Sequence, residues 1–317
     1  MAVNDIVNRS AAGPLIPVEH SREIIKEVEK ESVFLRMARR LPNMTAKQRK
    51  LPVLAALAQA YFVGSDTGLK QTTKMEWGEL TIEAEELAVI VPIPDAVLDD
   101  ADYDLWSEIR PSLVEAMGAK VDLAALHGQD KPSTWPAGIV PAAVAAGNSV
   151  TLGTGTDLYD DVLGENGVIA QIEEDGYVAT GLVGAINLRA KMRALRSNDR
   201  PVFATAPSQE TGQISPYTLD GHAIVFPENG GIDPTEALLI AGDWRKAVYA
   251  IRQDITFEVF RQGVISDADG KVILNLMQQD ASAVRVVFRM GWQRAKPINR
   301  VNPAENAHPF SVLLPAE

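Results

Sequence analysis

The sequence has no cysteine among its 317 residues, which excludes disulfide bonds, thiolate metal ligands and cysteine nucleophiles together. No apolar run approaches the ~18 residues that a membrane-spanning helix needs. The N-terminal stretch MAVNDIVNRSAAGPLIP has no basic flank followed by an apolar core, so it is not a secretory signal. Apolar residues make up 46% of the chain, which is enough for a buried core. We therefore expect a globular protein without disulfides or membrane helices.

Motifs that carry catalytic chemistry are also missing. The four histidines are not spaced as metal ligands, and the stretch GTGT lacks the Lys-Ser/Thr pair of a phosphate-binding loop. Adjacent acids such as Glu85-Glu86 point apart on a strand or helix, so they make poor acid–base pairs. His127 falls at the end of a predicted helix, where the helix dipole favours a cation. These absences predict a protein that is not an enzyme, with no catalytic residue, cofactor or metal site.

Charge is distributed unevenly along the chain, whose formal net charge is −12. Residues 32–74 carry eight basic side chains and one acid, Asp66, whereas residues 75–115 carry twelve acids and one base, Arg110. Adjacent segments of opposite sign attract each other within one chain or between copies; alternatively, each is a solvated face. The sequence leaves these alternatives open. The acidic total disfavours a protein whose whole surface binds nucleic acid.

Periodicity and chain breakers predict the elements of the first half. In order, they are an irregular arm over 1–17, a helix over Glu19–Leu41, strands over Lys50–Val63 and Leu80–Pro94, and a long helix from about 104 to Leu126 that ends at His127-Gly128. The polar stretch GSDTGLKQTTKMEWGEL lies between the two strands and is too long for a tight hairpin turn. Such a loop predicts a projecting finger.

The second half begins with a connector rich in Gly, Pro and Thr. The connector spans 128–156 and is followed by a helix over Asp157–Asp175, a strand over Val178–Ile186 and a basic helix over Leu188–Ser197. An irregular region over 200–235 then leads to strands over Ala237–Ala241, Ala247–Ile251 and Ile255–Val264. The chain ends with a hairpin turn at Asp269-Gly270 followed by Lys271–Leu276, a strand over Ala283–Arg289 and an irregular tail. No βαβ repeat occurs, so the fold class is α+β.

Several stretches, taken in this order, resemble the major capsid proteins of tailed bacteriophages, which have the Hong Kong-97 fold. RRLPNMTAKQRKLPV is similar to that family's passage from an N-terminal arm to an extended hairpin. AYFVGSDTGLKQTTKMEWGELTIEAEELAVIVPIPDAVLDDADYDL resembles its long polar hairpin, returning strand and acidic turn. LWSEIRPSLVEAMGAKVDLAALHGQDKPSTWPAGI resembles its spine helix, and AVRVVFRMGWQRAKPINRVNPAENAHPFSVL resembles its closing strand and tail.

This resemblance implies a self-assembling shell protein with five parts. They are an N-terminal arm over 1–49, an extended loop over 50–85, a peripheral domain over 86–140 with its spine helix at about 104–126, an axial domain over 141–276, and a peripheral return with the C-terminal tail over 277–317. In this family, hexamers and pentamers tile an icosahedral shell around double-stranded DNA. The extended loop reaches over a neighbouring subunit.

The same resemblance implies two sets of contact residues. Lys70, Lys74 and Trp77 of the extended loop are expected to contact a neighbouring subunit. The arm is expected to face the inner surface or another subunit through six basic residues, Arg36, Arg39, Arg40, Lys47, Arg49 and Lys50. The founding member of the family joins Lys to Asn covalently, and the tail here offers Asn299, Asn302 and Asn306. Most relatives do not cross-link, so solvated lysines are the simpler expectation.

The implied partners are other copies of the chain, a separate scaffolding protein, a portal, decoration proteins and packaged DNA bound without sequence preference. Assembly in the host cytoplasm and a final location in the virion capsid are implied, with no membrane. A scaffold-like N-terminal extension is not expected, because the arm begins almost at Met1. Two alternatives remain: an encapsulin-like nanocompartment shell that encloses cargo enzymes, and an enzyme with an unrecognised site.

Overall fold

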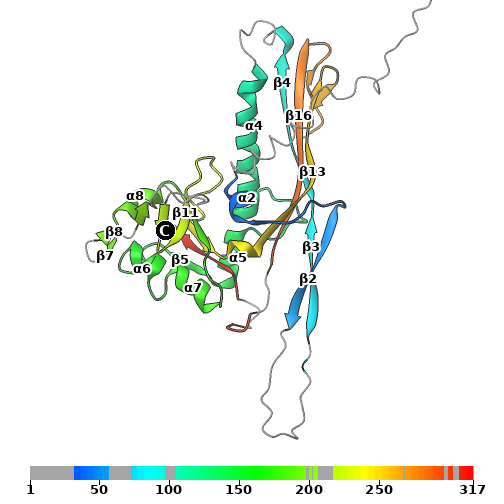
Figure 1. Ribbon diagram of the computed structural model, residues 1–317. Coiled ribbons are helices and arrows are strands. Elements are labelled where there is room, and N and C mark those ends of the chain that lie inside the picture. The colour runs from blue at the N-terminus through cyan, green and yellow to red at the C-terminus, as the bar shows by residue number, and fades with distance from the viewer. Residues whose placement is uncertain are drawn as a thin grey trace, which may run out of the picture.

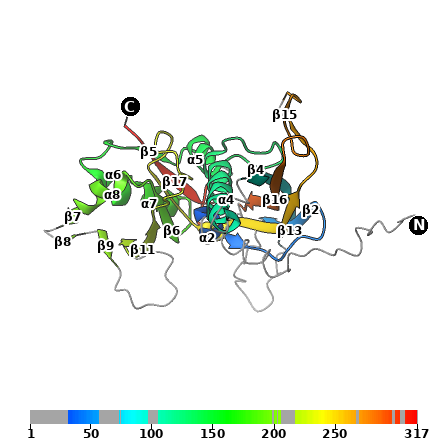
Figure 2. The same ribbon diagram turned by 90° about the horizontal axis from the view of Figure 1, so that it is seen from above.

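The computed structural model describes residues 32–56, 73, 75–96, 105–197, 200–201, 203–205, 217–266, 269–295, 299–302 and 307–316. They form two lobes and a narrow hairpin that projects away from both (Figure 1). Seen from above, a long helix lies end-on between the lobes (Figure 2). The helix predicted before residue 32, the loop tip over 57–72 and the acidic turn over 97–104 lie outside the described residues, as do Lys70 and Lys74.

The four-stranded lobe consists of one sheet and helix α4 (Leu105–Asp122). Its strand order is β1 (Arg39–Arg40), β13 (Ala247–Phe260), β16 (Ala281–Arg294) and β4 (Glu85–Pro94), with β1 parallel to β13 and the other pairs antiparallel. Alternate residues of β4, including Leu87, Val89 and Val91, pack into the same core as Met117 of α4. This period of two is the pattern of a sheet with one buried face.

Helix α4 continues into a π-helical turn, η1 (Leu123–His127), and ends at Gly128. Gly128 adopts φ 74°, the left-handed conformation that closes many helices and that glycine accepts without strain. The predicted end of the long helix is thereby confirmed. Pro111 lies inside α4, and the helix continues through it.

The seven-stranded lobe contains a mixed sheet flanked by short helices. Its strand order is β5 (Ser149–Thr151), β17 (Phe310–Leu314), β12 (Leu239–Gly242), β6 (Gly181–Gly184), β11 (His222–Val225), β10 (Tyr217–Leu219) and β9 (Phe203–Thr205). Its helices are α5 (Ile139–Ala146), α6 (Leu158–Leu163), α7 (Val168–Glu174) and α8 (Leu188–Arg193), with a single 3-10 turn, η2 (Trp244–Lys246). A short pair, β7 (Arg196–Ser197) and β8 (Arg200–Pro201), follows α8.

Two hairpins extend from the lobes. The projecting hairpin pairs β2 (Gln48–Ala56) with β3 (Glu76–Glu83). The smaller one pairs β14 (Val264–Ser266) with β15 (Val272–Asn275). The predicted Asp269-Gly270 turn lies within this smaller hairpin, and Gly270 has φ 80°, as a tight turn requires.

One hydrophobic core joins the two lobes. It includes Phe288 of β16 and Val312 of β17, which belong to different sheets. Its aromatic centre holds Phe34 of α2 (Val33–Met37), whose ring lies 5.2 Å from that of Trp292 in an edge-on arrangement. Trp135 also contacts Trp292 edge-on at 6.5 Å. Because this core is shared, the lobes form one body with α2 fixed at its centre.

Three predicted helices are wrong in extent. The helix predicted over Leu188–Ser197 ends at Arg193, because Arg196–Ser197 forms strand β7 and pairs with β8. The helix predicted over Glu19–Leu41 ends at Met37, because the chain turns to extended backbone and Arg39–Arg40 pairs with β13. The helix predicted over Asp157–Asp175 is instead α6 and α7. The chain breaks between them at Gly164 and Gly167, where a Cβ atom would lie less than 3 Å from backbone atoms of α6.

Several regions predicted as irregular contain short elements. The connector over 128–156 contains α5 and β5, the region over 200–235 contains β8 to β11, and the tail contains β17. These elements have three to eight residues each, apart from the two-residue β8, so their local signals are weak, and pairing with distant strands stabilises them. The strands predicted over Ala237–Ala241 and Ala283–Arg289 are confirmed as β12 and part of β16.

Strand pairing joins segments that are far apart in the chain. β13, within the range 141–276, pairs with β16 in the four-stranded lobe. β17, within the range 277–317, pairs with β12 and β5 in the seven-stranded lobe. Both strands are locally regular, but nothing in their own residues names a partner. The chain therefore crosses between the lobes more often than the sequence predicts.

Candidate functional site

The base of the projecting hairpin rests on a small core of its own. Ile82 and Ala84 are buried there with Met44, Val248 and Ala250. Ala84 separates β3 from β4, and its N–H donates to the Lys47 carbonyl, 2.9 Å away. From this junction the hairpin leaves the body as two strands, and no third strand from the described part of the chain pairs with them (Figure 1). Since an isolated two-stranded ribbon is marginally stable in water, the hairpin needs a further surface to pack on.

Charged side chains tie β2 to β3. Lys50 Nζ lies 2.7 Å from Glu79 Oε2, and Lys47 Nζ lies 3.3 Å from Glu83 Oε1 and 3.5 Å from Glu85 Oε1. The hydrogen bond to Glu83 raises the pKa of Lys47. These pairs join the basic segment to the acidic segment within one chain. The attraction that the sequence left open between intrachain and intersubunit contacts is therefore partly intrachain.

The other predicted basic residues are distributed around the base of the hairpin. Arg49 donates from Nη1 to the Pro42 carbonyl at 2.7 Å, and Arg40 donates from Nη2 to Asn43 at 3.3 Å. Arg36 and Arg39 are exposed. Arg39 makes no side-chain hydrogen bond or ion pair with any residue that the structure describes. Of the six residues, Lys47, Lys50, Arg40 and Arg49 thus have side-chain contacts within the chain.

Trp77 lies on β3, opposite Leu54 of β2. Its side chain is 65% exposed, and that of Met75 just before it is 47% exposed. A tryptophan with this exposure is not part of the core. Large exposed apolar side chains on a projecting element are typical of protein–protein contacts.

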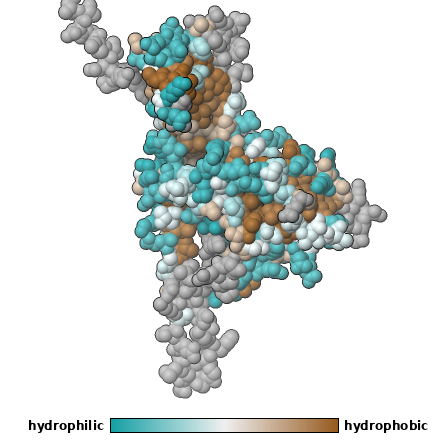
Figure 3. Space-filling view, turned by 180° about the vertical axis from the view of Figure 1, so that it is seen from behind, coloured by the Kyte–Doolittle hydropathy of each residue, from teal (hydrophilic) through white to brown (hydrophobic). Residues whose placement is uncertain are grey.

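Apolar side chains are also exposed at the upper end of the four-stranded lobe (Figure 3). The β14–β15 hairpin contributes Val264, Val272 and Ile273, which are 53% to 63% exposed, and Met277 just after it is 72% exposed. This exposed surface is not among the sites that the sequence predicts. The sequence does carry a sign of it, because apolar residues lie on both sides of the Asp269-Gly270 turn. β14 and β15 pair only with each other among the described strands, so these side chains stay exposed.

Asp122 joins three parts of the chain at the end of α4. Its buried carboxylate accepts hydrogen bonds from Ser32 Oγ at 2.6 Å, the N–H groups of Val33 and Phe34 at 3.0 and 2.9 Å, and Asn229 Nδ2 at 3.0 Å. Burial raises the pKa of Asp122 to about 6, although these hydrogen bonds lower it. This carboxylate thus fixes the first described residues of the N-terminal arm to α4 and to the loop of Asn229.

His127 links the end of η1 to the seven-stranded lobe. Its Nε2 accepts from the Asp233 N–H at 3.0 Å, so Nδ1 carries the proton that is donated to Glu236 at 2.8 Å. The side chain has no exposed surface. His127 thus lies in the last turn of the helix, as the sequence predicts, and its ring connects that end to the segment of Asp233 and Glu236.

The asparagines considered for cross-linking hold the tail against α7. Asn299 donates to the Asp175 carbonyl at 2.7 Å, and Asn302 donates to the Asp175 carboxylate at 2.9 Å. The N–H of His308 donates to the same carboxylate at 2.8 Å. Asn306 lies outside the described residues. Both described asparagines are thus engaged within their own chain.

No group of three or more metal-ligating side chains occurs in the part of the chain that the structure describes. Among the same residues, no helix is both long enough and apolar enough to cross a membrane.

Comparisons with known proteins agree on one family. The phage capsid family matches residues 12–295. The major capsid protein of Staphylococcus phage 80alpha is 24% identical over 292 residues, which span 90% of this chain and 84% of that protein. A solved structure from Microbacterium phage Oxtober96 has a TM-score of 0.75 at 32% identity, covering 90% of this chain and 91% of its own. One from Mycobacterium phage Bobi has a TM-score of 0.74 at 29% identity, covering 99% and 100%.

The two lobes, the long helix between them and the projecting hairpin define an α+β protein of the Hong Kong-97 fold, as the sequence predicts. The chain belongs to the phage capsid family. Its role as a structural protein that assembles into the capsid of a virion is thereby confirmed and is favoured over the nanocompartment alternative.

Proposed function

We propose that this chain forms hexamers and pentamers that close into an icosahedral capsid around double-stranded DNA. The projecting hairpin lies on a neighbouring subunit, with Lys70, Lys74 and Trp77 as its contacts. The exposed hairpin is the observation that supports this proposal. Its two strands, with Trp77 65% exposed, have no further surface to pack on among the described residues of the monomer. A neighbouring copy supplies that surface.

The basic residues of the arm have a second role in this proposal. Arg39 is exposed and unpaired within the described residues, so it is available to DNA phosphates or to another subunit. Lys47 and Lys50 are held by Glu83 and Glu79, and they stiffen the hairpin. A separate scaffolding protein, a portal and decoration proteins act with the capsid during assembly in the host cytoplasm.

Electron microscopy of the purified chain, with and without a co-expressed scaffold, tests this function directly. Closed shells with five-fold and six-fold units are expected, and particles from infected cells are expected to contain DNA. A chain that stays monomeric at high concentration with scaffold present contradicts the proposal. Shells that hold protein cargo and no DNA support the nanocompartment alternative instead.

Trp77→Ala tests the contact made by the hairpin. We expect the yield of shells to fall by at least about tenfold, because large aromatic residues at interface centres commonly contribute 2 kcal/mol or more to binding. The thermal unfolding temperature of the monomer is expected to stay within about 1 °C of the wild type, because Trp77 is mostly exposed. Val178→Ala serves as the matched control, because the Val178 side chain is 62% exposed but belongs to the seven-stranded lobe and not to the hairpin. Equal losses of shell yield and monomer stability in Trp77→Ala contradict a role in contact.

A further inference from the structure

The seven-stranded lobe carries two segments of opposite charge that are not paired with each other. Residues 148–188 contain seven acids and no base, whereas residues 189–201 contain five bases and one acid, Asp199. The acids belong to α6, α7 and the adjoining turns, and the bases to α8, β7 and β8. No ion pair joins the two segments within the described part of the chain. The attraction between them is therefore unused in a single copy.

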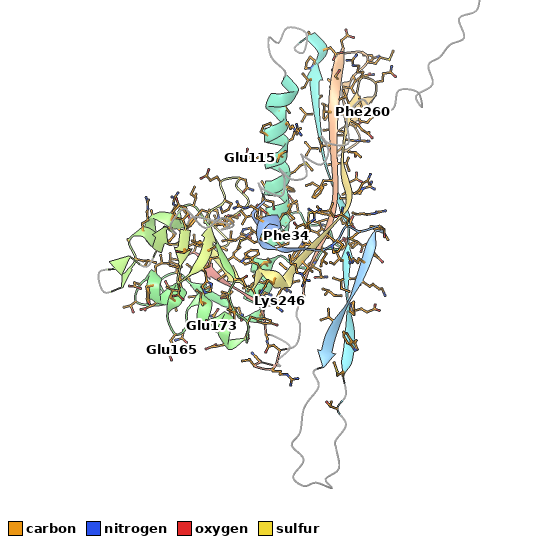
Figure 4. The ribbon with its side chains drawn as sticks, in the orientation of Figure 1. Phe34, Glu115, Glu165, Glu173, Lys246 and Phe260 are labelled. Carbon is orange, nitrogen blue, oxygen red and sulfur yellow. The ribbon has the colours of Figure 1, made fainter. Side chains whose placement is uncertain are left out.

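The helices of the two segments lie on different sides of the lobe, whereas β7 and β8 lie at its outer end (Figure 1). In Figure 1, α8 lies on its upper side, and α6 and α7 lie on its lower side. Figure 4 places Glu165 and Glu173 at that lower margin. This arrangement explains why their charges do not meet within one chain.

The basic side presents two free cations. Lys191 and Arg193 are exposed on α8, and their side chains make no hydrogen bond or ion pair with a described residue. Arg189 differs, because its guanidinium stacks on the Tyr217 ring at 4.4 Å and donates to the Tyr217 hydroxyl. The burial of Leu188 and Met192 fixes α8 against the lobe, so Lys191 and Arg193 project from a rigid support.

The acidic side contains a hollow of about 640 Å³ beside α6. Its lining includes Thr156, Asp160, Glu165 and Asn166. Asp161, at its inner wall, is already used, since its carboxylate accepts from the N–H groups of Gly153 and Gly155 at 2.7 and 2.6 Å. Glu165 is exposed and unpaired among the described residues, as are Glu173 and Glu174 on α7.

We infer that the seven-stranded lobes of adjacent copies pack head to tail, with Lys191 and Arg193 of one copy against the acidic hollow and α7 of the next. This inference rests on the proposed assembly into rings. A contact between two different surfaces of the same chain closes into a ring when the rotation permits. The charges favour a second copy of the chain as the partner. In a ring, every subunit then has its basic side paired with one neighbour and its acidic side paired with the other. An external anion or cation would satisfy one side and leave the other exposed.

Charge reversal tests the contact. Lys191→Glu with Arg193→Glu is expected to lower shell yield by at least about tenfold, since like charges facing across an interface cost several kcal/mol. Glu165→Lys with Glu173→Lys is expected to do the same. Thermal unfolding of the monomer is expected to stay unchanged in both, because all four side chains are exposed. The charge-preserving variant Lys191→Arg with Arg193→Lys is expected to assemble as the wild type does.

Two restorations make the test specific. The variant that carries all four reversals is expected to recover assembly, because the two surfaces are complementary again. Mixing the two double variants is expected to restore six-membered rings. Lys191→Glu with Arg193→Glu makes the basic side acidic, and Glu165→Lys with Glu173→Lys makes the acidic side basic. The two variants can therefore alternate around the ring with opposite charges facing each other. Wild-type yield from either double variant, or no recovery in the fourfold variant, overturns the head-to-tail contact while wild-type shells still form. Absence of shells from the wild type itself would instead overturn the proposed function.

Discussion

Replacing Asp122 with alanine is expected to lower the free energy of unfolding by about 4 kcal/mol or more, because four donors lose their acceptor and each buried donor left without one costs about 1–3 kcal/mol. The carboxylate accepts four hydrogen bonds, and three of them come from Ser32, Val33 and Phe34 at the start of α2. The fourth comes from Asn229. Removing the acceptor thus loosens α2 and the loop of Asn229 together. Chemical denaturation measures the loss, and hydrogen exchange at the Val33 and Phe34 amides locates it.

Asp122→Asn separates charge from shape. The amide keeps the volume but turns two hydrogens toward groups that are themselves donors, so a loss of similar size is expected. Asp130→Asn is the matched control, because Asp130 is exposed and pairs only with Lys120 at 2.6 Å, and its change is expected within about 0.5 kcal/mol. Equal stability of Asp122→Asn and Asp130→Asn would contradict the role assigned to Asp122.

The pH dependence of stability gives a second readout of Asp122. Burial raises its folded pKa to about 6, from an ordinary value of 3.8. Between these values the folded chain binds more protons than the unfolded chain, so this group contributes stability that is fully present below about pH 4 and is lost as the pH rises through about 6. The wild type is therefore expected to gain about 1 kcal/mol relative to Asp122→Asn when the pH falls from 8 to 5. Denaturation of both proteins at each pH measures this difference.

The elements that the sequence predicted best are those with a long local pattern. The four-residue spacing of apolar residues in α4 and the glycine at its end both have local causes, and both were identified correctly. The short strands β10, β11 and β17 have three to five residues each and exist through pairing with distant strands. A local pattern does not name a strand's partner, so the sheet to which β13 and β17 belong could not be read from the sequence.

The structural role of Asp122 also could not be predicted from the sequence. It lies in the long helix among ordinary polar residues, and its partners are more than 85 positions away in the chain. The contact residues follow from the resemblance and not from a local pattern. The exposure of Trp77 agrees with a contact role, which stays a prediction. The intrachain partners of Lys47 and Lys50, which are Glu83 and Glu79, are evident only from the β2–β3 register.

Gly291 lies where the projecting hairpin leaves the four-stranded sheet. A Cβ atom at this position would lie 2.3 Å from the Glu83 carbonyl oxygen and 2.9 Å from Ile82 Cγ2. On one side Gly291 pairs with Ala250, while the ladder between β16 and β4 ends just before it, at Met290 and Glu85. The backbone of Glu83 therefore passes directly over Gly291, and any larger residue must displace the base of the hairpin.

Gly291→Ala is expected to lower the free energy of unfolding by about 2–3 kcal/mol, because the clash is with backbone that cannot turn aside. We also expect shell yield to fall by more than this instability explains, since a shift at Glu83 is carried along the hairpin to Trp77. Gly184→Ala is the matched control, because it also lies in a buried strand but the three atoms nearest to its Cβ would be side-chain atoms, the first being Phe226 Cε1 at 2.9 Å, and not backbone. Thermal unfolding, limited proteolysis of the hairpin and electron microscopy of both variants measure these effects. If Gly291→Ala forms shells at wild-type yield, the direction of the hairpin does not depend on this crossing.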